Sequence, residues 1–192
     1  MLKRVAVLLA CLFVLCASKV SAINVKYFSE DVQIKSALTL LDDVGAKEIF
    51  DNLQENSVKI KFYDLSQISY DYKNHFAINT TDVWGNRYIL INTKFQNAPT
   101  EQIACLIAHE SCHKGKVATL EEETTATRKE AQYWSVLKKH NVQYAQTALT
   151  QRLNSLANLE HSSTVSHDYI QDRISNSSFY RNQLALRDRR KF

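Results

Sequence analysis

Residues 103–115 read IACLIAHESCHKG, an apolar run interrupted by His109, Glu110 and His113. Apolar residues of this density predict a buried helix. Histidines four residues apart lie one turn above each other on the same face of a helix. The run therefore predicts two imidazoles presented together from the protein interior, and the rest of the fold has to be built around them.

The limits of this helix are marked by Pro99 and Gly115. Proline is favoured at the first position of a helix, and glycine often follows the last one. We expect the helix to begin at about Pro99, to include His113 and to end near Gly115.

The order His109-Glu110-x-x-His113 is an HExxH pattern. Two imidazoles one turn apart can occupy adjacent corners of a zinc tetrahedron. Glu110 projects about 100° around the helix axis from His109, so it is expected to reach a zinc-bound water rather than the metal. The pattern predicts His109 and His113 as metal ligands and Glu110 as a general base.

A catalytic zinc needs a third protein ligand and one open position. A metzincin would have glycine at position 116 and histidine at position 119, where this chain has Lys116 and Thr119, so that class is excluded. Carboxylates follow instead at residues 121–123. The same acidic run also suits the first turn of a helix.

With these residues the chain resembles the gluzincin metallopeptidases over roughly Lys59 to Leu137. The resemblance implies a third ligand at Glu123, with Glu122 as the alternative, and a Thr127 standing where the family often has an aspartate that supports a ligand histidine. It implies a small zincin-like domain with a strand–helix–helix metal core and Zn²⁺ as the cofactor.

The resemblance also implies an edge strand beside the metal that pairs with an extended peptide substrate, supplied by residues 76–79 or 88–92. A further histidine or tyrosine would stabilise the oxyanion. The candidates are Tyr133, His140, His167 and Tyr169.

The spacing of apolar residues predicts an α+β fold with helices on both sides of the HExxH run. Helical spacing occurs at 32–41, 46–53, 120–140 and 148–159, strict alternation at 58–62, and paired strands are expected at 76–79 and 88–92 around Trp84-Gly85-Asn86. Trp134, Val136 and Leu137 are expected in the core. Cys105 and Cys112 are expected there too, too far apart on one helix for a disulfide.

The first 22 residues have a basic start, an apolar core and a small-residue end at Val20-Ser21-Ala22, as in a secretory signal peptide. Its removal would take Lys3, Arg4 and Lys19 and lower the net charge from +4 to +1, so no nucleic-acid footprint is expected on the rest of the chain. We expect three parts: a signal peptide (1–22), a metal-binding domain (23–160) and a polar, basic, partly helical tail (161–192).

These patterns predict an exported, periplasmic or secreted zinc metallopeptidase that acts on peptides or proteins and keeps no membrane anchor after cleavage. The alternative is an exported protein whose zinc is structural or binds a partner without hydrolysis. Glu110 favours chemistry, because a structural zinc needs no general base.

Overall fold

Helices dominate the computed structural model, which describes residues 23–114, 118–139, 142–164 and 168–177. Within these ranges the helices accompany one small mixed sheet, so the predicted α+β class is confirmed. The predicted signal peptide, Gly115, His140, His167 and most of the basic tail lie outside the described residues.

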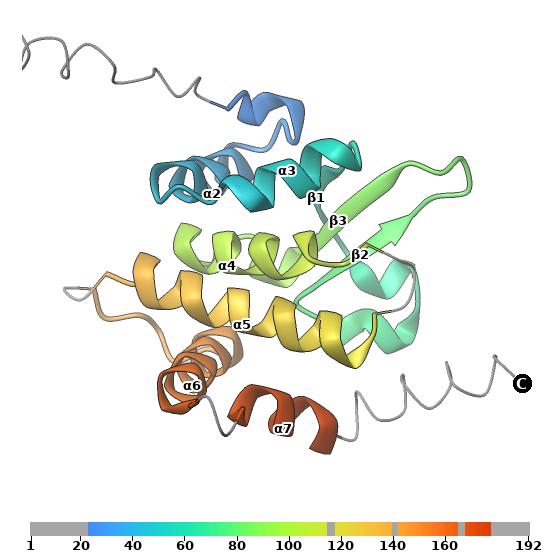
Figure 1. Cartoon of the computed structure of the whole chain (residues 1–192). Helices are drawn as coiled ribbons and strands as arrows, with labels where there is room; N and C mark the ends of the chain where they lie inside the picture. Colours follow the sequence, from blue (N-terminus) through green and yellow to red (C-terminus); the bar gives the residue numbers. More distant parts are fainter. Residues whose placement is uncertain (1–22, 115–117, 140–141, 165–167, 178–192) are drawn as a thin grey trace, which may run out of the picture.

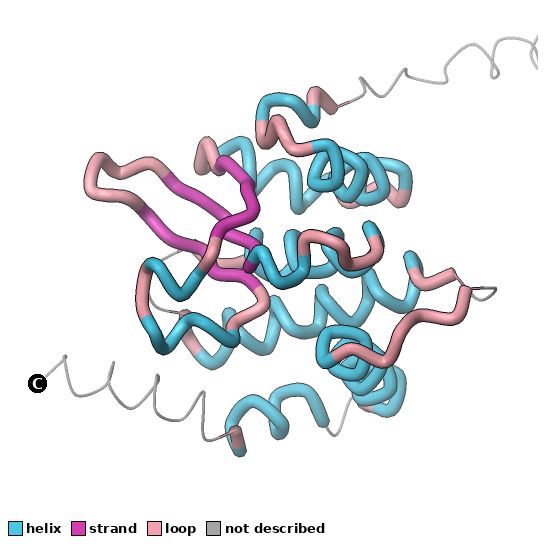
Figure 2. The backbone as a smooth tube through the Cα atoms, turned by 180° about the vertical axis from the view of Figure 1, so that it is seen from behind, coloured by secondary structure: helices cyan, strands magenta, loops and turns pink. Residues whose placement is uncertain are grey.

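The elements follow one another from an N-terminal helix pair through the sheet to four further helices (Figures 1 and 2). The α-helices and strands are α2 (Val32–Asp43), α3 (Lys47–Glu55), β1 (Lys59–Tyr63), β2 (Ala77–Thr81), β3 (Arg87–Asn92), α4 (Thr100–Ser111), α5 (Leu120–Leu137), α6 (Ala148–Ser162) and α7 (Tyr169–Asn176). The short 3₁₀ helices are η1 (Val25–Tyr27), η2 (Leu65–Gln67), η3 (Tyr70–Asn74) and η4 (Thr93–Phe95). No helix in the described part of the chain is long and apolar enough to cross a membrane.

The sheet has the strand order β1-β3-β2, with β1 parallel and β2 antiparallel to β3. The expected hairpin is confirmed, and its turn is closed by Asp82, whose carboxylate accepts the N–H groups of Trp84 and Asn86. Gly85 in this turn has φ +89°, a conformation that glycine adopts without steric penalty. β3 lies between the other two strands, so the expectation that residues 88–92 form a free edge is wrong, because both edges of β3 are already paired.

Helix α4 is enclosed on nearly every side. It lies between the α2–α3 pair and α5, and it meets the sheet at its C-terminal end (Figure 1). Every residue from Glu101 to Ser111 is buried. Cys105 is buried, Cys112 is partly buried, and both are free thiols, as the spacing predicted.

Helix α5 packs against α4 and against the two C-terminal helices, and α6 also contacts α4 directly. Ala131 of α5 packs with Leu156 of α6 and with Ile170 and Ile174 of α7. Trp134 and Leu137 are buried as expected, but Val136 is 66% exposed. The expectation of a buried Val136 is wrong because two residues at 100° each turn it about 200° from Trp134, onto the outer face of the helix.

Two aliphatic truncations, one in buried α4 and one on the exposed face of α5, test the packing of the core. Ile107→Ala removes a fully buried side chain and should lower the free energy of unfolding by about 2–5 kcal/mol. Val136→Ala on the exposed face of α5 should change it by no more than about 0.5 kcal/mol. Urea unfolding in the presence of a chelator measures both, and equal losses would contradict the packing described here.

Candidate metal centre

The C-terminal end of α4 positions the two histidines. Pro99 caps the helix rather than starting it, and the last helical residue is Ser111, so the expectation that the helix includes His113 is wrong by two residues. Cys112 keeps αR dihedrals, and the His113 N–H donates to the Glu110 carbonyl at 3.3 Å. The chain thus tightens to a 3₁₀-like turn, and the rings of His109 and His113 remain 5.3 Å apart.

Two side chains of the β2–β3 hairpin hold this end of the helix. Asn79 Nδ2 donates to the Glu110 carbonyl at 2.9 Å, and an Arg87 nitrogen donates to the His113 carbonyl at 2.7 Å. Carbonyls at a helix terminus have no partner inside the helix. The hairpin gives the His113 carbonyl a donor and the Glu110 carbonyl a second one, and thereby holds the backbone of His113 beyond the helix end.

Glu123 on the first turn of α5 faces both imidazoles. Its Oε2 lies 3.7 Å from Nε2 of His109, and its Oε1 lies 3.8 Å from Nε2 of His113. One ligand atom from each of the three residues lies within 4.8 Å of the others, and all three side chains are buried. The structure therefore brings the three expected ligands together.

Glu122, the alternative third ligand, is occupied elsewhere. It forms a capping box with Thr119: its Oε2 accepts the Thr119 N–H at 3.0 Å, and the Thr119 hydroxyl accepts the Glu122 N–H at 2.9 Å. Its other oxygen accepts the N–H of Lys114 at 3.3 Å. Within the acidic run, Glu122 thus caps the start of α5 and Glu123 faces the histidines.

The spacing of the ligand atoms of His109, His113 and Glu123 fits a metal ion. The distances of 3.7 and 3.8 Å are too long for hydrogen bonds. Ligands bound tetrahedrally to zinc at about 2.0–2.1 Å lie about 3.3 Å apart, so side-chain movements from separations within 4.8 Å would bring one atom of each residue into coordination. Two imidazole nitrogens and one carboxylate form a donor set that zinc accepts. This buried cluster can bind a metal ion.

The far nitrogen of His109 meets a carboxylate that the sequence did not reveal. Nδ1 lies 3.0 Å from Oε2 of Glu130, a short contact that is off the line of an ideal hydrogen bond. Thr127, which the resemblance placed in this role, is buried, and its hydroxyl has no hydrogen-bond partner among the described residues. The carboxylate is one helical turn further along α5 than expected, where a longer side chain reaches the ring.

Glu110 is a buried carboxylate beside the cluster. Burial raises the pKa of Glu110 to about 7; His109 lowers this pKa, Glu123 and Glu130 raise it, and the backbone amide of Asn79 lowers it. A carboxyl group of this kind can hold or release a proton near neutral pH, as a general base requires.

The surroundings shift the pKa values of the two histidines in opposite directions. Burial, His109 and Arg87 together lower the pKa of His113 to about 3, so His113 is a neutral imidazole at physiological pH. Burial opposes protonation of His109 too, but the Glu130 carboxylate outweighs it and raises the pKa of His109. Burial alone would raise the pKa of Glu130, yet Arg152 and His109 lower it to about 2, which keeps this carboxylate ionised.

Of the expected oxyanion stabilisers, two lie within the described residues. The Tyr133 hydroxyl is 3.5 Å from Oε1 of Glu48 on α3, and burial with Glu48 raises the pKa of Tyr133 to about 12. Tyr169 is the first residue of α7 and is 42% exposed. Tyr133 is thus turned toward α3.

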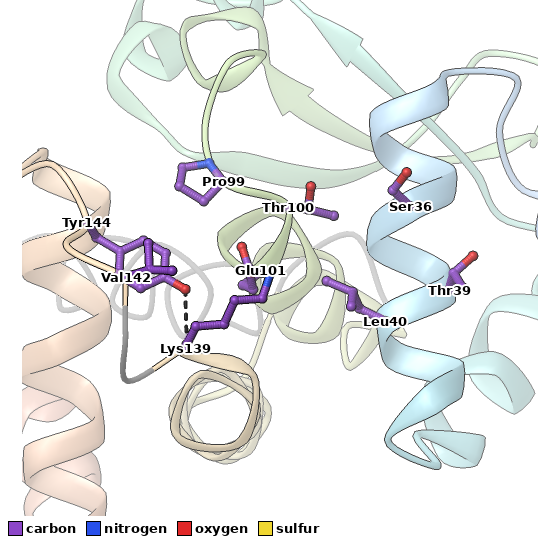
Figure 3. Close-up of a pocket in the computed structure, with 9 residues that line it drawn as sticks. All are labelled: Ser36, Thr39, Leu40, Pro99, Thr100, Glu101, Lys139, Val142 and Tyr144. Atoms are coloured by element: carbon purple, nitrogen blue, oxygen red, sulfur yellow. Dashed lines mark hydrogen bonds and ion pairs between the residues drawn. The ribbon is translucent and has the colours of Figure 1, made fainter.

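A separate groove of about 560 Å³ lies at the other end of α4, between α2 and the chain that follows α5 (Figure 3). Lys139 pairs with Glu101 there at 2.6 Å, and the Tyr144 hydroxyl accepts the Lys139 N–H at 3.1 Å. Glu101 lies eight residues before His109, about 12 Å along the helix. The groove is therefore distinct from the histidine cluster, and its two charges neutralise each other.

Sequence reasoning missed four residues that support the cluster: Glu130, Arg152, Asn79 and Arg87. A signal existed for Glu130, which follows Glu123 by seven residues and so lies two turns along the same face. No local pattern marks the others, because they reach the cluster from a hairpin and from a distant helix.

Comparisons with protein-family models, with curated proteins and with solved structures found no match for this chain. The case for a function therefore rests on the geometry of the site.

Proposed function

We propose that this chain is an exported zinc metallopeptidase of the gluzincin type, with His109, His113 and Glu123 as ligands and Glu110 as the general base. The observation that carries the proposal is the placement of three buried ligand atoms within 4.8 Å of one another, next to a fourth side chain that is a buried carboxylate. A site that only held a structural metal would have no use for Glu110.

The chemistry follows from the charges of the residues. A bound zinc would supply a Lewis acid that acidifies water and polarises a peptide carbonyl. Glu110 would accept the proton from the attacking water and deliver it to the leaving amine. Glu130 would hold the His109 ring so that Nε2 faces Glu123, and the neutral His113 would offer its lone pair without first losing a proton.

The neighbouring strand supports a peptide as the substrate. β2 is an edge strand, and Phe76 accepts a hydrogen bond from Asn92 of the strand β3 beside it. Hydrogen-bonded pairs alternate along an antiparallel ladder, so the backbone groups of Ala77, Asn79 and Thr81 point away from β3. An extended peptide could pair with them by strand addition, next to the end of α4 that Asn79 contacts.

The two adjacent carboxylates of α5 provide a matched test of the third ligand. Glu123→Ala should weaken zinc binding by more than the roughly 10–100-fold that follows loss of an outer-shell partner. Glu122→Ala should lower stability through the lost capping box but leave zinc affinity near that of the wild type. Competition with a chromophoric chelator measures both affinities, and the reverse order would move the ligand to Glu122.

His109→Ala and His113→Ala should each abolish stoichiometric zinc binding, because two remaining ligands rarely retain the metal against a chelator. Elemental analysis of the purified variants measures this. Full zinc occupancy in both variants would refute the assignment.

Glu110→Gln separates hydrolysis from simple metal binding. The variant keeps the shape of the side chain but cannot accept a proton from water. It should retain zinc and the fold while turnover falls by roughly 10²–10⁴-fold. The measurement is cleavage of a quenched-fluorescent peptide library by zinc-loaded protein beginning at Ile23, with zinc content determined in parallel.

Two results would contradict the peptidase. Equal turnover by Glu110→Gln and the wild type would exclude Glu110 as the base. A zinc-loaded wild type that cleaves no peptide in the library would favour the non-hydrolytic alternative, with the zinc-binding cluster retained.

A further inference from the structure

Arg152 of α6 donates two hydrogen bonds to Glu130, the carboxylate that contacts His109. Its Nε donates to Oε1 of Glu130 at 2.9 Å, and a terminal guanidinium nitrogen donates to Oε2 at 2.7 Å. Glu130 is fully buried, and the guanidinium lies 5.7 Å from the centre of the Phe76 ring. Arg152 therefore stands between the carboxylate on α5 and the residue that precedes β2.

The two hydrogen bonds from Arg152 fix the orientation of the Glu130 carboxylate. Oε1 of Glu130 accepts from Arg152 Nε, whereas Oε2 lies within reach of both the terminal guanidinium nitrogen and Nδ1 of His109. A bidentate arginine fixes both the plane and the rotation of its carboxylate. With Oε2 held toward Nδ1, the opposite nitrogen of the ring, Nε2, is held toward Glu123.

We propose that Arg152 is a positioning residue for the metal centre, and that through it the docking of α6 and the binding of metal are coupled. The inference rests on the proposed zinc site and adds to it a distant residue and a helix that the HExxH pattern does not include. Removal of Arg152 leaves a buried carboxylate with no fixed orientation, which frees the His109 ring. Coupling is reciprocal, so metal binding should in turn hold α6 more firmly.

Arg128 offers a matched control. It also links α5 to the C-terminal helices, through Glu160 of α6 at 3.4 Å and through Asp168, which caps α7. Its guanidinium contacts these two carboxylates rather than Glu130. Loss of Arg128 should therefore weaken helix packing without disturbing His109.

The experiment compares the wild type with Arg152→Met, Arg152→Lys and Arg128→Met. Zinc dissociation constants come from chelator competition, and the absorption spectrum of the cobalt-loaded protein reports the ligand geometry. Arg152→Met should bind zinc about 10–100-fold more weakly and change the cobalt spectrum. Arg152→Lys keeps the charge but lacks the fork, so its affinity should lie between those of the wild type and Arg152→Met. Arg128→Met should match the wild type in both measurements.

Hydrogen exchange provides a second readout, independent of turnover. Zinc should slow amide exchange in residues 148–162 of the wild type and of Arg128→Met, but much less in Arg152→Met. If Arg152→Met does not fold, as judged by circular dichroism, Arg152→Lys decides the question by its zinc affinity and its exchange.

Three outcomes overturn the inference. Wild-type zinc affinity in a folded Arg152→Met, or in Arg152→Lys when Arg152→Met does not fold, would show that the arginine serves packing alone. Equal losses in Arg152→Met and Arg128→Met would assign the effect to general loosening of the C-terminal helices. A wild type that binds no zinc would refute the proposed site itself, a failure recognised before any variant is compared.

Discussion

The structure depends on burying α4 on every side while its last turn carries ionisable side chains. Buried polar groups are tolerated only when they are paired. Several groups at this end of α4 meet partners from other elements: Glu130 faces His109, Arg87 and Asn79 donate to the carbonyls of His113 and Glu110, and Glu123 faces both rings. The helices and the hairpin packed around α4 therefore shape the cluster as well as the core.

The buried carboxylates around the two histidines favour a bound cation. Three buried carboxylates, Glu110, Glu123 and Glu130, lie around two imidazoles, and a bidentate arginine holds Glu130. The carboxylates that stay ionised in this buried place favour a cation beside them, while burial raises the pKa of Glu110 to about 7 and so keeps part of it neutral. Burial makes this preference stronger, because the low dielectric of the interior reduces the screening of each charge.

The small sheet acts on the site through its hairpin. β1 anchors β3 in the body of the protein, while β2 remains at the edge and contributes Asn79 to the end of α4. One residue thus offers its side chain to the helix that carries His109 and its backbone to the open side of the strand. This double use joins the proposed peptide-binding edge to the proposed metal site.

The sequence by itself predicted most of the secondary structure and the pairing of two histidines on one helix face, because both depend on local spacing. The period of apolar residues located the helices and the hairpin, and the interval from His109 to His113 placed two imidazoles on one face. The sequence could not determine which strand lies at the edge of the sheet, or that Glu130 rather than Thr127 contacts His109. Only the tertiary structure decided these points, and it alone brought Arg152 and Arg87 to the site. Such contacts join residues tens of positions apart, and no local periodicity records a distance through space.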